Sequence, residues 1–307
     1  MNRRLRVILS IALICLTVVA FAYYLNHNSY LLTQLWHTHL SSLIWLFLLY
    51  AVWFLALCGI VLASVRICQT SLEPKEGFLL NAYSTLVNFF VPGQGGIVVR
   101  GAYLKKIKKI KIRNYIFVTL IYYMFYAIIA SLLLLLASRP LWQALSAAII
   151  VGFISLLVIY LFINRSRMKM TDLAITKINL SYLFVATLVQ AIIQIAIYGV
   201  ELHSVNSHIS LSQMITYTGA ANFALFVALT PGAIGIREAF LLFTRHLHHI
   251  SSANIVAANI IDRAVFIVVL GVLFCLTLGF HAKYKSLWRR PLGADDQSNT
   301  ASDELVS

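Results

Sequence analysis

The sequence predicts an all-α polytopic membrane protein, an inverted-topology repeat with about six spanning helices and two re-entrant segments broken by glycine and proline. Of its 307 residues, 61% are hydrophobic and 11% are charged, whereas soluble domains are about a quarter charged. Apolar segments of about the 20 residues needed to cross a bilayer recur along the chain. Charged residues gather between these segments, as the cost of burying ions in hydrocarbon requires.

The net charge of +14 could indicate a nucleic-acid partner, but most lysines and arginines lie beside apolar spans, which is the topogenic pattern of membrane proteins. The four cysteines have no C-x-x-C spacing, so neither a zinc site nor a disulfide framework is predicted. Serine-nucleophile, P-loop and H-E-x-x-H motifs are missing from the sequence. We therefore expect no enzymatic activity, metal, cofactor or nucleic-acid partner.

The first half begins with a cationic segment that contains Arg3, Arg4 and Arg6, which predicts a cytoplasmic N-terminus. Val7–Tyr24 is expected to cross outward. Ser41–Ala63 is expected to return, because the loop between them carries no lysine or arginine.

The next apolar stretch, Phe78–Val99, has cations on both sides, with seven of them between Arg100 and Arg113. Both flanks are therefore expected in the cytoplasm, and a segment with both ends on one side cannot be a single crossing. Its middle, Pro92 to Gly96, reads PGQGG and would break a helix. The segment is predicted to be re-entrant, with its irregular backbone satisfied by protein or by a water-filled cavity.

The remaining part of the chain repeats this order. The expected spans are Tyr115–Ala137, Trp142–Ile163, Ser181–Val200 and Ala253–Gly279. The loop that starts at Glu201 lacks lysine and arginine up to Ser210 and is expected outside, whereas the cationic C-terminus is expected in the cytoplasm. This parity predicts a second re-entrant segment, Leu211–Leu242, which enters from outside. Three full crossings would also satisfy the parity.

Two sets of span, span, re-entrant segment and span result, and Pro92 and Pro231 occupy corresponding places in the two sets. The halves begin on opposite sides of the membrane, and paired broken segments in such a repeat point to a site at the midplane. We predict one membrane domain over residues 1–280, with halves 1–140 and 141–280. Residues 281–307 are expected to form a disordered cytoplasmic tail.

The two broken segments carry related motifs, VPGQGGIVVR at 91–100 and LTPGAIGIREA at 229–239. Through these motifs the chain resembles the lysylphosphatidylglycerol synthase transmembrane-region family, over roughly residues 5–285. Fused members of that family flip aminoacylated phospholipids made by a soluble synthase domain. Only a short polar tail follows Phe280 here, so the resemblance implies a stand-alone, flippase-like membrane domain that lacks the synthase. Some stand-alone members are linked to the handling of lipids or glycolipids.

The sequence departs from the family pattern at two places. Relatives carry an acid where this chain has Ile97, and many have a Glu-Arg pair where this chain has Tyr122-Tyr123. The resemblance therefore implies that the first half has lost part of any role that these acids perform.

The broken helix ends are expected to attract a lipid phosphate together with Arg100 and Arg237. Glu238 and Asp262 would balance charge, bind a cationic headgroup or carry a proton. In the alternative, Arg237-Glu238 and Asp262-Arg263 neutralise each other as buried pairs. The candidate substrate-binding residues are Pro92, Gly93, Gly95, Gly96, Arg100, Gln190, Gln194, Pro231, Gly232, Gly235, Arg237, Glu238, Asp262 and Arg263.

Three further patterns have two interpretations each. Gln190, Gln194 and Tyr198 share one helix face and either line a polar path or join helices by hydrogen bonds. The lysine-rich segment 104–110 is either an interfacial basic helix or a topogenic signal. The histidines at 246, 248 and 249 lie in an expected external loop and lack the further ligands of a metal site.

The leading functional prediction is a translocase for a phospholipid or polyprenyl-linked saccharide in a bacterial inner membrane, with both termini in the cytoplasm. The alternative is a non-catalytic accessory subunit of a glycosyltransferase or phospholipid-modifying enzyme, which would be its partner.

Overall fold

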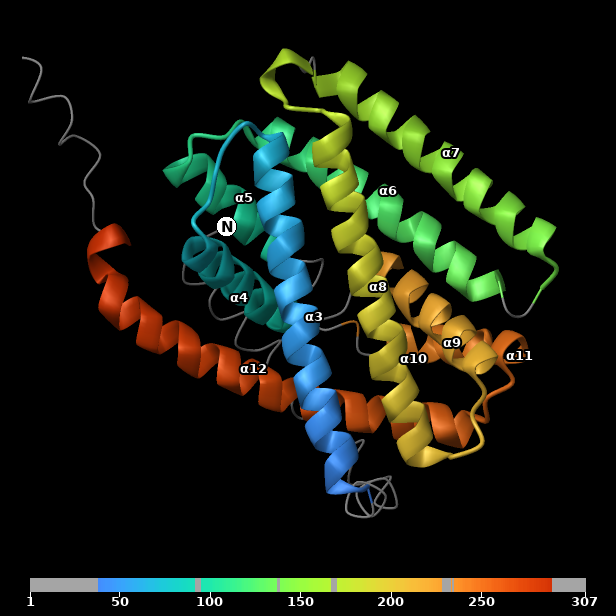
Figure 1. Ribbon diagram of the computed structural model, residues 1–307. Helices are drawn as coiled ribbons and strands as arrows, with labels where there is room; N and C mark the ends of the chain where they lie inside the picture. The colour runs from blue at the N-terminus through green and yellow to red at the C-terminus, as the bar shows by residue number, and fades with distance from the viewer. Residues whose placement is uncertain are drawn as a thin grey trace, which may run out of the picture.

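The computed structural model of the chain describes residues 38–91, 95–136, 139–166, 170–227, 233 and 235–288. Every regular element within these residues is helical, which confirms the predicted all-α class (Figure 1). Labelled as in the figure, the elements are α3 (Leu40–Ile67), α4 (Pro74–Phe90), α5 (Gly95–Ile107), α6 (Ile112–Leu136), α7 (Leu141–Ser166), η1 (Met170–Asp172), α8 (Lys177–Val205), α9 (Leu211–Ala224), η2 (Leu225–Val227), α10 (Ile236–Phe243), α11 (Arg245–His248) and α12 (Ser252–Trp288). The expected first span, Val7–Tyr24, and residues 289–307 of the expected tail lie outside the described residues.

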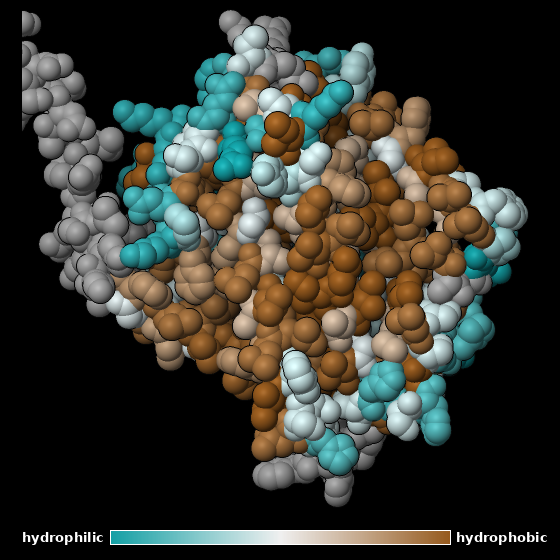
Figure 2. Space-filling view, in the orientation of Figure 1, coloured by the Kyte–Doolittle hydropathy of each residue, from teal (hydrophilic) through white to brown (hydrophobic). Residues whose placement is uncertain are grey.

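Five of the described helices are long and apolar enough to cross a membrane: α3, α6, α7, α8 and the part of α12 up to Phe280. They correspond to the predicted spans that begin at Ser41, Tyr115, Trp142, Ser181 and Ala253. The shortest has 25 residues, or about 38 Å of helix, which exceeds the roughly 30 Å of bilayer hydrocarbon. Figure 2 shows hydrophobic side chains across the middle of one face and hydrophilic ones toward its margins. The chain is therefore a multi-pass membrane protein.

The two stretches predicted to be broken are helical hairpins. Helices α4 and α5 pack against each other, and α9 packs against α10. Gly96 lets α5 approach α4, because a Cβ atom at this position would lie 2.3 Å from the carbonyl oxygen of Ser84. Helix α9 begins with a capping box, in which Gln213 N–H donates to Ser210 Oγ at 3.3 Å and Ser210 N–H donates to Gln213 Oε1 at 2.9 Å.

Helices α3 and α8 lie side by side in the middle of the molecule (Figure 1). Around them, contacts of the first half correspond to contacts of the second. Helix α3 packs on α4 as α8 packs on α9, α4 packs on α12 as α9 packs on α6, and α5 packs on α6 as α10 packs on α12. The starts of corresponding helices are also evenly spaced, because α8 follows α3 along the chain at nearly the same interval as α12 follows α6.

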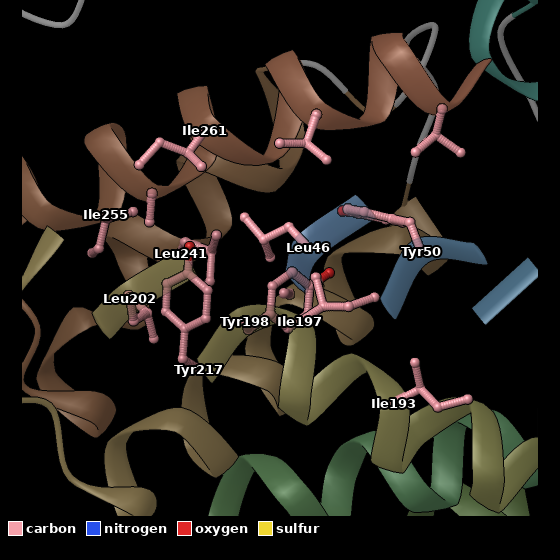
Figure 3. Close-up of a cluster of buried hydrophobic side chains, with 14 of the residues drawn as sticks. Leu46, Tyr50, Ile193, Ile197, Tyr198, Leu202, Tyr217, Leu241, Ile255 and Ile261 are labelled. Atoms are coloured by element: carbon pink, nitrogen blue, oxygen red, sulfur yellow. The ribbon is translucent and has the colours of Figure 1, made fainter. Parts of the chain in front are cut away.

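The described residues form two interior clusters of buried apolar side chains. One joins α3, α8, α9, α10 and α12 (Figure 3), and the other joins α3 to α4, α5 and α6. Because lipid tails are as apolar as these side chains, close packing and hydrogen bonds hold such an interior together more than exclusion of water does.

One expectation about the segments outside the spans was wrong, and the helices of two further segments have other bounds than the sequence suggested. Glu201 lies in the last turns of α8, which extends to Val205, and it is wholly buried instead of lying in an external loop. The lysine-rich segment does not form one helix. Helix α5 ends at Ile107, Lys109 has a left-handed backbone with φ 55°, and Lys108 pairs with Glu76 at 2.8 Å. Helix α12 continues to Trp288, into the segment expected to be a tail.

Candidate functional site

A cavity of about 250 Å³ lies where both hairpins meet the central helices. Its wall is formed by side chains of α3, α4, α5, α6, α8, η2, α10 and α12, together with Ala233. Six of the candidate substrate-binding residues line this cavity: Arg100, Gln190, Gln194, Arg237, Asp262 and Arg263. Residues from both halves of the chain are thus brought to one place.

The other candidates lie around the hairpin breaks or outside the described residues. Gly95 and Gly96 begin α5, and Gly235, with φ 83°, precedes α10. Glu238 adjoins the cavity through Arg263. Pro92, Gly93, Pro231 and Gly232 are outside the described residues.

The most deeply buried charges of the cavity wall are Arg237 and Asp262, which are 5% and 1% exposed. Arg237 Nη1 donates to Asp262 Oδ2 at 2.7 Å, and the Tyr50 hydroxyl donates to Asp262 Oδ1. The guanidinium also lies over the ring of Tyr198, 5.0 Å from its centre. Asp262 therefore accepts hydrogen bonds at both oxygens, which keeps a buried carboxylate ionised.

A second ion pair borders the cavity, where Arg263 Nη2 donates to Glu238 Oε1 at 3.3 Å. The other oxygen, Glu238 Oε2, accepts from the N–H of Gly235 at 2.7 Å. Glu238 thus caps α10 and also ties this helix to α12.

The pairing between sequence neighbours, Arg237 with Glu238 and Asp262 with Arg263, is therefore wrong. Neighbouring residues on a helix point in different directions, so they do not face each other. The ion pairs instead run between α10 and α12, and each joins partners from these two helices.

Arg100 differs from the other two arginines of the cavity. It is half-buried on α5 and forms no ion pair with a carboxylate among the described residues. Its Nε–H is buried and has no acceptor there. Tyr122 and Tyr123 line the cavity beside it. Arg100 is thus a cation facing the cavity without a counter-charge from the described chain.

The side-chain amides of Gln190 and Gln194 on α8 fit both interpretations, a polar path and hydrogen bonding between helices. They line the cavity, and they also join α8 to α6. The Tyr122 hydroxyl donates to Gln190 Oε1 at 3.0 Å, and the Tyr126 hydroxyl lies 3.3 Å from Gln194 Oε1. Interhelical bonding therefore positions the polar wall.

The first N–H groups at the hairpin breaks already have protein partners. Gly96 N–H donates to Asn88 Oδ1 at 2.7 Å, and Gly235 N–H donates to Glu238. These two N–H groups are thus occupied, so the donors that a ligand meets are side chains of the cavity wall, the guanidinium groups among them.

The sequence reasoning missed several residues of this site. Helix α4 presents a polar stripe to the cavity, formed by Asn81, Ser84, Thr85 and Asn88. Its spacing of three and four residues is the available signal. Glu201 was also missed, although it lies three residues after Tyr198 and continues the face that Gln190 and Gln194 begin. Its carboxyl lies beside that of Asp262.

The histidine-rich turn does not assemble a metal site in the described part of the chain, where no three histidine, cysteine, aspartate or glutamate side chains gather. His248 is buried, its Nε2 atom lies 3.1 Å from the carbonyl oxygen of Leu241, and its ring packs on Tyr217. Its contacts hold α11 against α9 and α10.

Comparison with known proteins agrees with the motifs at the hairpin breaks. The family model described as lysylphosphatidylglycerol synthase TM region matches residues 7–273. None of the curated proteins compared with the chain matches it significantly. Because the family match covers most of the 307 residues, the chain belongs to the lysylphosphatidylglycerol synthase transmembrane-region family.

Proposed function

We propose that this protein is a translocase for a lipid with an anionic phosphate in its headgroup, and that the cavity beside Arg100 receives that headgroup. In this proposal the protein moves its ligand without changing it chemically. It resides in a bacterial inner membrane with both termini in the cytoplasm, as the cationic flanks of its spans favour.

The single observation that carries the proposal is the position of Arg100, which lines a cavity of a membrane protein and forms no ion pair with a carboxylate of the described residues. A cation within hydrocarbon depth is costly, so it is a functional candidate by default. A guanidinium also matches two oxygens of a phosphate in its fork of N–H groups. An arginine that has no counter-charge among the described residues therefore favours an anionic ligand.

The size and chemistry of the cavity support a headgroup as its occupant. At about 250 Å³ it is smaller than the roughly 300 Å³ at which sites for drug-sized ligands begin. It can hold a phosphate with a small polar substituent, whereas acyl or polyprenyl chains would stay in the surrounding lipid. The cavity wall also offers hydroxyl and amide groups that can form hydrogen bonds with glycerol or sugar hydroxyls, from Tyr50, Asn88, Gln190 and Gln194.

The proposal includes an inverted repeat with re-entrant hairpins. It is supported by the corresponding helix contacts and by the nearly equal intervals along the chain from α3 to α8 and from α6 to α12. In inverted-repeat transporters the substrate site lies between the repeats, near broken helices, and one repeat rocks against the other. The cavity is bordered by α4 and α5 of one half and by η2 and α10 of the other.

The test is the leaflet distribution of phospholipids and polyprenyl-linked lipids in cells that lack the protein, measured with a membrane-impermeant label. Deletion should shift one lipid toward the leaflet in which it is made, and wild-type protein should restore its distribution. Arg100→Gln should not restore it, whereas Arg66→Gln should, because Arg66 is exposed at the end of α3. An unchanged distribution of every major lipid on deletion would contradict the proposal.

A further inference from the structure

Glu201 is a buried acid that the site described so far does not use. It lies in α8 with 0% exposure, and neither carboxyl oxygen has a hydrogen-bond donor among the described residues. An ionised carboxylate in such a place, without a donor or an ion pair, carries a large desolvation cost. The position therefore favours the neutral, protonated form.

Asp262, which lies beside Glu201, is the acceptor for a proton carried by Glu201. The two carboxyl groups are in side-chain contact. Asp262 already accepts from Arg237 and from Tyr50, so it is the ionised member of the pair. Two carboxylates in contact repel each other, and one shared proton converts the repulsion into a hydrogen bond from Glu201 to Asp262.

The other charged or titratable groups that face Glu201 come from every helix packed around it. They are Tyr50 of α3, Tyr198 of α8, Tyr217 of α9, Arg237 of α10 and Arg263 of α12. Figure 3 shows three of them, Tyr50, Tyr198 and Tyr217, within one buried cluster. The Nε and Nη2 groups of Arg237 have no acceptor among the described residues. They give an ionised Glu201 a partner after its proton leaves.

The charge of the site connects this proton to the ligand. With Glu201 protonated, the arginines at 100, 237 and 263 face the acids at 238 and 262, which leaves one positive charge, that of Arg100. With Glu201 ionised, that positive charge is balanced within the protein. Binding of a monoanion and binding of a proton therefore favour each other, by linkage.

We propose that Glu201 and Asp262 form a proton-binding site, and that the protein takes up one proton on Glu201 together with one monoanionic phosphodiester in the cavity. The proton comes from water to Glu201 Oε and returns to water when the anion leaves, so no other bond changes. The proposal rests on the proposed function in one respect, the binding of an anion beside Arg100. It adds that a proton gradient can drive that anion across the membrane.

The experiment counts protons. Purified protein in detergent is titrated with short-chain phosphatidylglycerol in buffers of different ionisation enthalpy, and the dependence of the measured heat on the buffer gives the protons bound per anion. Wild type should take up about one proton per anion at a pH where Glu201 is ionised before binding. Glu201→Gln should bind the anion with no proton uptake, and the exposed Glu73→Gln should behave as wild type. Wild-type binding with no proton uptake at any pH tested would overturn the proposal.

Two further arms keep the outcomes separable. Glycerol phosphate in place of the lipid distinguishes a free phosphate from a lipid headgroup, because only a lipid site should prefer the acylated probe. Infrared spectra provide a readout that needs no ligand: at a pH low enough to protonate Glu201, the carbonyl band of a protonated carboxyl should be present in wild type and Glu73→Gln and lost in Glu201→Gln. If wild type binds no anion but shows this band, the proposed function fails and the proton site stands. If no such band depends on Glu201, the proposed proton site is ruled out. If Glu201→Gln does not fold, the proposal is decided by whether wild type takes up a proton with the anion.

Discussion

Arg237 of α10 and Asp262 of α12 are joined by a hydrogen-bonded ion pair of 2.7 Å, and both side chains are almost completely buried. The pair connects the second hairpin to the last span, at the wall of the cavity. Removing one partner of a buried pair leaves the other charge without compensation. The pair therefore serves the fold and the site together, so its variants require a stability measurement before any functional one.

The single substitutions Arg237→Gln and Asp262→Asn should each lower the free energy of unfolding by about 3–5 kcal/mol. A double substitution to apolar residues, Arg237→Met with Asp262→Leu, should cost less than either single change, because no buried charge is left alone. Thermal unfolding in detergent, followed by the loss of the monodisperse peak, measures all three. A double variant less stable than both single variants would contradict this account of the pair.

The second ion pair should contribute less to stability. The Glu238 side chain is 25% exposed, so Glu238→Ala should cost about 1–2 kcal/mol, from the lost cap on Gly235 and the weakened contact with Arg263. The same thermal assay applies. Glu238→Gln should recover most of the loss, because its amide oxygen can still accept from Gly235 N–H. Equal losses of stability in Glu238→Ala and Arg237→Gln would show that burial does not determine how much each ion pair contributes to the free energy of unfolding.

The first hairpin should be sensitive to a methyl group at Gly96. Gly96→Ala places Cβ 2.3 Å from the carbonyl oxygen of Ser84, and overpacking of this kind costs about 1–3 kcal/mol. Gly101→Ala is the matched control in the same helix, since its nearest neighbour would be Tyr115 at 3.5 Å. Alanine should stabilise the helix there by up to about 1 kcal/mol. Thermal unfolding of both variants should therefore move in opposite directions.

The spans could be predicted from the sequence, because an apolar run of bilayer length is a local property. Such a run lies within each of the helices that begin at Leu40, Ile112, Leu141, Lys177 and Ser252. The breaks near Gly96 and Gly235 could be predicted too, since glycine and proline act on the backbone at their own positions. The positions of the spans and breaks can therefore be predicted from a single sequence.

The contacts of the site could not be predicted in the same way, because they depend on how distant helices pack. Arg237 meets Asp262, and Tyr50 meets the same carboxylate from 212 residues away. A single sequence contains no signal for such pairings. Glu201 was missed for a different reason: its span was ended at Val200, where the apolar run stops, although α8 continues to Val205.

His248 predicts a pH dependence of stability. Burial lowers the pKa of His248 below its usual value of 6.5, and the neighbouring His249 and His246 lower it further. As the pH falls below about 6.5, the unfolded chain binds a proton there before the folded chain does, so stability decreases. Above that pH, His248 is neutral in both the folded and the unfolded chain and does not contribute to the pH dependence of stability. Thermal unfolding across this range should show a shallower decrease for His248→Asn than for wild type.

The control for this prediction is His39→Asn, because His39 is exposed and its side chain makes no capping bond to α3. It should keep the wild-type slope. An equal slope in wild type and His248→Asn would rule out His248 as a source of the acid sensitivity.

The most direct test of the central claim, that the cavity at Arg100 carries an anionic lipid headgroup across the membrane, is transport by the purified protein in proteoliposomes. A fluorescent phosphatidylglycerol in the inner leaflet should become accessible to an impermeant quencher faster with wild type or Arg66→Gln than in protein-free vesicles. Arg100→Gln should lose this acceleration while remaining folded. If wild type accelerates neither this lipid nor a polyprenyl phosphate, yet deletion disturbs lipids in cells, the protein is an accessory subunit. If Arg100→Gln transports as wild type does, the cavity is not the site.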